Sequence, residues 1–298
     1  MKRSALELAV MLLTAVFGVK AQEVEVAAEH VTSSTLKDGD GNKYGSGSLM
    51  RYKLKYTQPL SVKFDQYHRP TIWTATLGCK YNVWDNNIQP EAYVPDKVIN
   101  LSARVMHIRP VGKRWTMMAM LGVNFNSVPK DLAFNKIIVN GACIFMHKMN
   151  KELTLGVGGA VLTSYGAPIV LPGFYVRWYR PGDWEFDFTC YGLANATVTK
   201  HFGKKFKLAG TLLDMEGTSS ILRRDGKGYI FSSMMMRSYL TPTLQLGKKS
   251  TLWLNAGTVF SRTARLHERK LSNFFKFGMG RKKFRPAVYL SVGYKQKF

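Results

Sequence analysis

The sequence is poor in acidic residues and cysteine, and almost nowhere does it show the apolar periodicity of an amphipathic helix. Asp and Glu total 19 against 43 Lys and Arg, so the formal net charge is +24. Such a basic balance is typical of nucleic-acid-binding proteins. The export signal described below takes the chain away from nucleic acid, however, so we expect no nucleic-acid partner. We expect anionic solutes and phosphate-rich lipopolysaccharide instead.

Three cysteines are an odd number for a chain that enters an oxidising compartment. Cys79, Cys143 and Cys190 each alternate with apolar residues, which places each thiol on the apolar face of an expected strand. Thiols on such a face behave as small hydrophobic groups. We therefore predict no disulfide.

Residue patterns for catalysis and metal binding are scarce. The six histidines do not form a His/Cys/Asp cluster with metal-ligand spacing, and none has a Ser and a carboxylate placed as in a hydrolase triad. Glu185 and Asp187 lie two residues apart on one strand face, an arrangement that also occurs in acid–base catalysis. Among so many cations, we interpret them as salt-bridge partners. The sequence thus predicts no enzyme, no catalytic residue, no metal and no cofactor.

The chain lacks a Pro- or Ser-rich linker, which indicates one domain after an export signal. Residues 1–21 begin with Lys2 and Arg3, continue through an apolar segment and end in Ala21. This pattern predicts a cleaved signal peptide and a mature barrel over residues 22–298. A membrane anchor is the alternative, but the uncharged run of residues 8–19 is short for a spanning helix.

Strand periodicity dominates the remaining sequence. Segments with alternating apolar and polar residues are joined by connections that are alternately short turns and longer loops, as in transmembrane β-barrels. Residues 153–176 carry no charge and are long enough for a membrane helix, but their prolines and glycines favour two strands. We predict an all-β fold, a single antiparallel up-and-down transmembrane barrel of about 12 strands, within about 10 to 14. The expected strands are 22–31 (or a lead-in), 50–56, 71–84, 97–109, 114–125, 136–146, 151–162, 168–179, 184–191, 194–201, 205–215, 228–246, 251–262 and 288–298.

The last segment ends in an amphipathic strand. Val288, Leu290, Val292 and Tyr294 alternate with more polar residues before Phe298 closes the chain. This ending resembles the insertion signal of bacterial outer-membrane barrels, with Tyr294 and Phe298 as the aromatic residues read by the barrel-assembly machinery. An edge strand of a soluble sandwich is the alternative interpretation.

Four segments together suggest a family: the signal peptide and residues 59–65 (PLSVKFD), 179–188 (YRPGDWEFDF) and 292–298 (VGYKQKF). With them the chain resembles uncharacterised outer-membrane barrels, a domain of unknown function, of Gram-negative anaerobes. The resemblance implies a β-barrel in the outer membrane of a Gram-negative bacterium, in contact with its lipid. It implies no substrate and no catalytic residue.

Strand parity identifies the side chains expected to line the lumen. They are Arg51, Lys53, Lys55, Lys80, Arg104, Arg177, Lys207, Arg237 and Lys295, against Glu185 and Asp187. A basic lumen favours anions, so the first hypothesis is a passive channel for small anionic solutes. The alternative is a closed structural barrel that binds lipopolysaccharide or a partner through basic outer loops, chiefly residues 262–285. An outer-membrane hydrolase is the weakest hypothesis.

Overall fold

The computed structural model describes residues 22–129, 136–164, 167–180, 182–224, 227–275 and 281–298. The predicted signal peptide, residues 1–21, lies outside the described residues. Within these ranges, no helix is long and apolar enough to cross a membrane.

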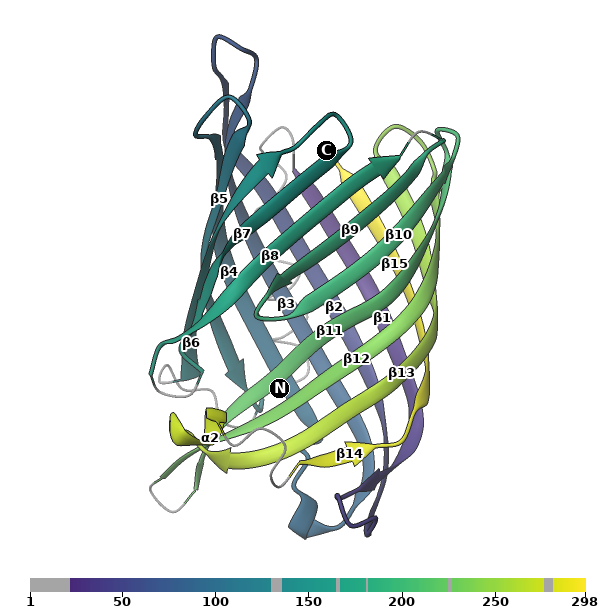
Figure 1. The fold of residues 1–298 in the computed structure, drawn as a ribbon. Helices are drawn as coiled ribbons and strands as arrows, with labels where there is room; N and C mark the ends of the chain where they lie inside the picture. Colours follow the sequence, from purple (N-terminus) through teal and green to yellow (C-terminus); the bar gives the residue numbers. More distant parts are fainter. Residues whose placement is uncertain (1–21, 130–135, 165–166, 181, 225–226, 276–280) are drawn as a thin grey trace.

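The chain folds almost entirely into strands (Figure 1). The strands are β1 (Glu23–Lys37), β2 (Lys43–Phe64), β3 (Pro70–Ile88), β4 (Lys97–Pro110), β5 (Trp115–Ser127), β6 (Ile137–Lys148), β7 (Leu153–Leu162), β8 (Ile169–Arg180), β9 (Trp184–Tyr191), β10 (Ala194–Phe202), β11 (Phe206–Arg224), β12 (Lys227–Gln245), β13 (Ser250–Glu268), β14 (Lys282–Phe284) and β15 (Ala287–Lys297). Two short helices, η1 (Pro90–Ala92) and α2 (Ser272–Phe275), lie in connections.

The strands close into one antiparallel barrel. Each strand pairs with its sequence neighbour, and β15 pairs with both β13 and β1. Because β14 also pairs with β13 and β1, it continues β15 as one wall strand, and the barrel has 14 strands. The prediction of an all-β barrel is confirmed, with a count at the upper limit of the expected range. Residues 153–176 form β7 and the first part of β8, as predicted.

We name the two ends of the barrel by their connections. At the turn end, short turns join β2 to β3, β4 to β5, β6 to β7, β8 to β9, β10 to β11 and β12 to β13. The first and last described residues also meet there, since Phe298 N donates to Gln22 O at 2.8 Å. The opposite end, which carries the longest connections, such as residues 89–96 between β3 and β4, is the loop end.

The outer face of the wall is apolar. Leu121 is 63% exposed and Val170 is 73% exposed, as expected for side chains that face lipid rather than a core. Trp115, Trp178 and Trp184 are exposed near the turn end, where they form part of an aromatic girdle. The alternation of the sequence therefore matches the two faces of the wall.

Two expected loops are shorter than predicted. The first two expected strands end at residue 31 and resume at residue 50, but β1 and β2 extend the hairpin so that only 38–42 connect them. We also expected a basic loop over residues 262–285, whereas β13 continues to Glu268 and β14 begins at Lys282. Both errors have one cause: the strands extend at the loop end into Gly-, Ser- and Arg-containing sequence that looks like loop but pairs in the sheet.

β9 and β10 are the shortest full strands of the wall, with 8 and 9 residues. The expected strands 184–191 and 194–201 are short for a membrane strand, which needs about 9–11 residues. The structure accommodates them as a short hairpin that turns at Gly192 and Leu193, part-way along the wall. Gly192 has a φ of 94°, a conformation that favours glycine over any other residue.

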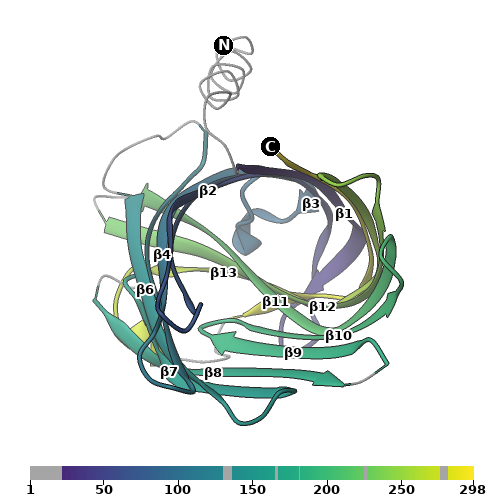
Figure 2. The ribbon, with the colours of Figure 1, turned by 90° about the horizontal axis from the view of Figure 1, so that it is seen from above.

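β11 leaves the wall where it runs past this hairpin. Its pairing with β12 is irregular between Thr211 and Asp214, and a bulge of this kind bends a strand. Beyond Asp214, β11 pairs only with β12. Viewed along the barrel, β11 and β13 run across the interior (Figure 2). The bore is therefore divided in the half near the loop end.

Candidate functional site

An apolar core fills the bore between β1–β4 and β12–β15 near the loop end. The ring of Phe231 is fully buried and meets Trp84 edge-on at a centroid distance of 6.1 Å. Val31, Leu49 and Met235 are buried in the same cluster. This packing resembles the interior of a soluble protein, so this part of the bore is filled by side chains.

Beside this core lies a network of ion pairs, centred on Glu216 of β11. Its carboxylate lies 2.7 Å from Arg51 Nη1, 3.0 Å from Lys53 Nζ and 2.6 Å from Lys80 Nζ. Arg237 Nη2 approaches the same carboxylate at 2.6 Å. The four cations come from β2, β3 and β12, so Glu216 ties the displaced strand to the opposite wall.

Two further carboxylates complete this network. Glu29 lies 2.7 Å from Lys53 Nζ and 3.2 Å from both Arg51 Nη1 and Arg237 Nη1. Asp214 accepts from Arg237 at 2.7 Å. Arg51 and Arg237 are 1% and 4% exposed, and buried charges of this kind are tolerated only when they are paired and hydrogen-bonded. Four cations face three carboxylates, so the network is nearly neutral.

A row of asparagines on β3, β4 and β5 holds β11 through hydrogen bonds to Ser219. Asn82 on β3 donates to Asn100 Oδ1 on β4 at 3.1 Å, and Asn100 donates to Asn126 Oδ1 on β5 at 2.7 Å. Asn100 also donates to the backbone oxygen of Ser219 at 2.9 Å, and Asn126 donates to the Ser219 hydroxyl at 3.1 Å. These side chains, the asparagine ladder, satisfy polar groups that the wall no longer pairs.

A cavity of about 480 Å³ opens on the far side of β11. It lies between the inner faces of β3–β6, the β9–β10 turn and the face of β11–β13 that points away from the apolar core. Four cations line it, and the described lining contains no Asp or Glu. The cationic residues are Lys80, Arg104, Arg265 and Arg281. Asparagine, serine and threonine supply most of the other polar groups.

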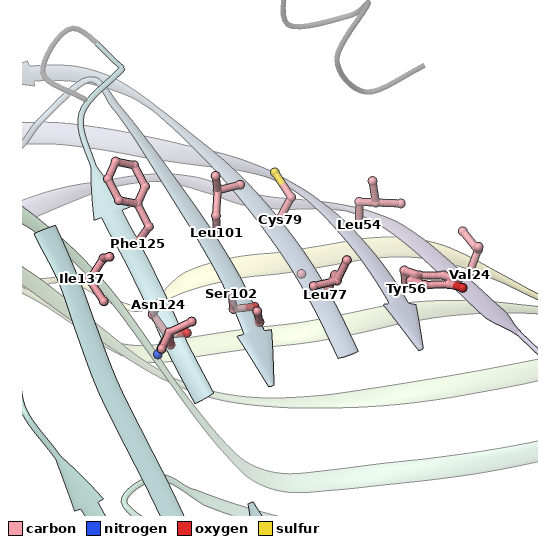
Figure 3. A pocket seen from close by; sticks show the side chains of 13 residues that line it. Val24, Leu54, Tyr56, Leu77, Cys79, Leu101, Ser102, Asn124, Phe125 and Ile137 are labelled. Atoms are coloured by element: carbon pink, nitrogen blue, oxygen red, sulfur yellow. The ribbon is translucent and has the colours of Figure 1, made fainter. Parts of the chain in front are cut away.

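A second hollow lies on the outer surface of β1–β6 and has a volume of about 560 Å³. Figure 3 shows Leu54, Cys79, Leu101 and Phe125 around it. Its lining is apolar, as expected for a depression in the lipid-facing wall at Gly78 and Ala103, and it contains no group suited to catalysis.

The three cysteine thiols are free and lie on β3, β6 and β9, strands that do not adjoin one another.

A family model described as "Domain of unknown function (DUF6268)" matches residues 17–297. The chain belongs to this family. The match covers the whole barrel, and the expected resemblance to an uncharacterised outer-membrane barrel family is confirmed. A closed strand barrel with an apolar outer face places this DUF6268 protein in the outer membrane of a Gram-negative bacterium.

No curated protein matches the chain. Among solved structures, a COG4313 outer membrane channel from Pseudomonas putida F1 is 9% identical with a TM-score of 0.49, over 95% of this chain and 97% of that one. The toluene transporter TodX of P. putida is 11% identical with a TM-score of 0.41, over 95% and 91%. Likeness at this level carries no information on solutes.

The structure distributes the predicted lumen residues over several clusters. Arg51, Lys53, Lys80 and Arg237 meet in the network around Glu216. Nearer the turn end, Lys55 pairs with Glu25 at 2.8 Å and Lys295 with Glu23 at 3.7 Å. Arg177 contacts both Glu185 and Asp187, at 3.1 and 2.9 Å. Lys207 lies opposite His201 and Thr243 in the sheet.

Glu185 and Asp187 do not balance the cations of the central network, contrary to our expectation that these two acids alone oppose the inward cations. The missed acids are Glu29, Asp214 and Glu216. Glu29 lies in the segment that we left open between a strand and a lead-in. Glu216 follows the bulge and lies one residue beyond the expected end of its strand. The alternation of Glu23 and Glu25 with Val24 and Val26 could have identified the first strand.

Arg262 corrects a further expectation. We assigned it to an exposed basic loop, but it is 1% exposed in β13, over the Phe284 ring at 3.7 Å, and its Nη2 donates to Gly47 O at 2.5 Å. Other cations of that segment are also engaged: Arg269 donates to Ser164 O at 3.1 Å, and Lys270 pairs with Glu268.

The expected assembly residues lie on the final strand. Tyr294 is on the outer face, with its hydroxyl 2.6 Å from Gln296 Oε1, and Phe298 is half exposed beside the first strand.

Within the described ranges, no group of three or more His, Cys, Asp or Glu is arranged to hold a metal ion.

Proposed function

We propose that this protein conducts small anionic solutes across the outer membrane, along a path that runs through the basic cavity beside β11. The observation that carries the proposal is the lining of that cavity, which contains four cations and, among the described residues, no Asp or Glu. Cations within low-dielectric walls attract anions and repel cations at close range.

Arg104 contributes most directly to this selectivity. Within the described part of the chain it forms no salt bridge, and its side chain is exposed on the inner face of β4. Lys80, in contrast, is shared with Glu216. An anion entering the cavity therefore meets at Arg104 a charge that no described carboxylate neutralises. Charge-assisted hydrogen bonds of this kind are strong.

The path avoids the axis of the barrel. The apolar core and the network around Glu216 fill the bore between β1–β4 and β12–β15, where Phe231 is fully buried and Arg51 is 1% exposed. Solutes would instead enter from the turn end, before the point where β11 bends inward. They would then pass along the face of β11 that points away from the apolar core.

Planar-bilayer recording of the purified protein tests this function. In dilute salt, we expect single-channel currents that prefer anions, and Arg104→Glu should weaken that preference. Lys113→Glu, in the turn that joins β4 to β5, is the matched control because it changes the same charge outside the cavity. A cation-preferring current in the wild type would refute the proposal.

The interlocked network favours a second candidate function. Side chains from β1, β2, β3, β11 and β12 cross the bore through the contacts of Glu29 and Glu216. Such bracing suits a closed structural barrel, which would bind lipopolysaccharide phosphates through cations at the loop end, such as Lys283. Absence of current at every salt concentration, from protein shown to be folded, would select this candidate.

A further inference from the structure

The barrel wall is interrupted beside the basic cavity. β9 and β10 turn back at Gly192 and Leu193, and the last pair between β8 and β9 is Gly173 with Tyr191. Residues 169–172 of β8 continue with β7 as their only partner strand. Residues 215–222 of β11 likewise pair with β12 alone. Two free strand edges thus flank the space beyond the hairpin.

This interruption lies at the depth of the lipid chains. Val170, on the unpaired part of β8, is 73% exposed, and Leu212, just before the bend of β11, is 62% exposed. Unpaired backbone groups are not tolerated against hydrocarbon unless they line a wet or occupied space. Pro172 removes one N–H from the β8 edge, and Asn100 caps the Ser219 oxygen on β11. Both strand edges therefore have fewer unpaired backbone groups and can face water or a ligand.

The cavity behind the interruption has two kinds of lining. Arg104 and Lys80 lie on the inner wall, whereas Leu162, Leu193 and Met234 lie around the hairpin turn and the outward face of β12. The loop end is bridged above the interruption by Arg269, which donates to the backbone oxygens of Ser164 at 3.1 Å and Thr163 at 3.4 Å. Between this contact and the β9–β10 turn, no strand of the described residues bridges the side of the barrel from β8 to β11, which leaves an approach to the cavity.

We infer that the interruption is a lateral doorway between this cavity and the surrounding lipid, and that the cavity takes an amphiphilic anion. The anionic head, a phosphate or carboxylate, pairs with Arg104 and Lys80, and the apolar chain lies against Leu162, Leu193 and Met234 toward the doorway. The inference rests on the proposed function in that both place an anion in the same cavity, but it adds the ligand class and the lateral route.

Photolabelling in vesicles tests the doorway. The probe is octyl phosphate with a diazirine at the end of its chain, incorporated in the bilayer with the full protein, and labelled residues are mapped by mass spectrometry. We expect label at Leu162, Leu193 or Met234, in addition to lipid-facing residues such as Leu121. Unlabelled octyl phosphate should compete for the cavity sites, and octanol should not.

Two variants make the test specific. Gly217 lines the cavity, and no atom lies within 4 Å of where its Cβ would be, so a side chain at this position starts in open space and Gly217→Trp is the variant chosen to fill the doorway. It should abolish the cavity label and spare Leu121. Leu212→Trp, on the outer face of the same strand, should change neither. Arg104→Gln should weaken competition by octyl phosphate about tenfold, the loss expected for one charge-assisted hydrogen bond.

The outcomes separate this inference from the proposed function. Label confined to lipid-facing residues, or cavity label unchanged by Gly217→Trp, overturns the doorway even if bilayer currents prefer anions. Cavity label that octanol displaces as well as octyl phosphate overturns the amphiphilic-anion assignment. Cavity label lost in Gly217→Trp and displaced by octyl phosphate alone supports the doorway, even where no current is recorded.

Discussion

Single side chains divide sharply between the two faces of the wall, and Leu121 on β5 illustrates the outer one. Leu121→Arg should destabilise the barrel by about 2–4 kcal/mol, because a cation near the bilayer midplane is costly. Asn124→Arg, on the cavity side of the same strand, should cost less because it meets water. Urea unfolding in lipid vesicles measures both values, and the reverse order would show that the faces have been exchanged.

At the same scale, Glu216 is the residue on which the central network depends. Its carboxylate pairs with four cations and is 10% exposed, so Glu216→Gln leaves buried charges uncompensated. Loss of one partner of a buried pair costs about 3–5 kcal/mol. Asp187→Asn is the control: its partner Arg177 is 53% exposed, and such pairs contribute about 0–1 kcal/mol. Equal losses of unfolding free energy in the two variants would argue against the network.

Among the elements, β11 determines the shape of the interior, and the asparagine ladder determines where β11 lies. Asn100→Ala removes hydrogen bonds to Asn126 and to the Ser219 oxygen. We expect β11 to move more freely and single-channel current to become larger or noisier. Asn140→Ala, which alters the same cavity without touching Ser219, should leave the current unchanged. A quiet, unaltered current in Asn100→Ala would mean that the ladder does not hold the strand.

The final strand is the element most directly linked to assembly. β15 pairs along its length with β1 and β13, and Phe298 N donates to Gln22 O. Deletion of Phe298 should reduce the yield of folded barrel in the membrane, because its ring resembles part of an insertion signal. Heat-dependent gel migration and membrane yield provide the measurement. Unchanged values in the truncated protein would remove Phe298 from the signal.

The sequence predicts the strands and their two faces correctly wherever a strand remains in the barrel wall. The outer stripe from Trp115 to Phe125 and the alternation of β15 follow from period two alone. The inward bend of β11 does not, because it depends on a bulge at residues 212–213 and on contacts with Asn100 and Asn126, far away in sequence. Parity counted across a bulge fails by one residue. Asp214 and Glu216 were missed for that reason.

The whole molecule is a wide barrel that is narrowed by one of its own wall strands, β11. Near the turn end, the salt bridges of Lys55, Lys295 and Arg177 lie along the inner surface. Toward the loop end, one part of the bore is filled and the other is a basic cavity. The sequence alone placed Lys53 and Lys55 among the cations expected to line the lumen and to favour anions. Because Lys53 is bound to Glu29 and Glu216, we propose Arg104 for the selectivity role instead.

The reversal potential across a planar bilayer with a gradient of dilute potassium chloride tests this account most directly. Wild-type protein should show a reversal potential of the sign set by chloride. This preference for anions should weaken in concentrated salt, because the screening length falls to about 3 Å at about 1 M. Arg104→Glu should move the potential toward zero, and Gly217→Trp should reduce the conductance. A potential of the sign set by potassium, or one unmoved by Arg104→Glu, would contradict an anion path through the cavity.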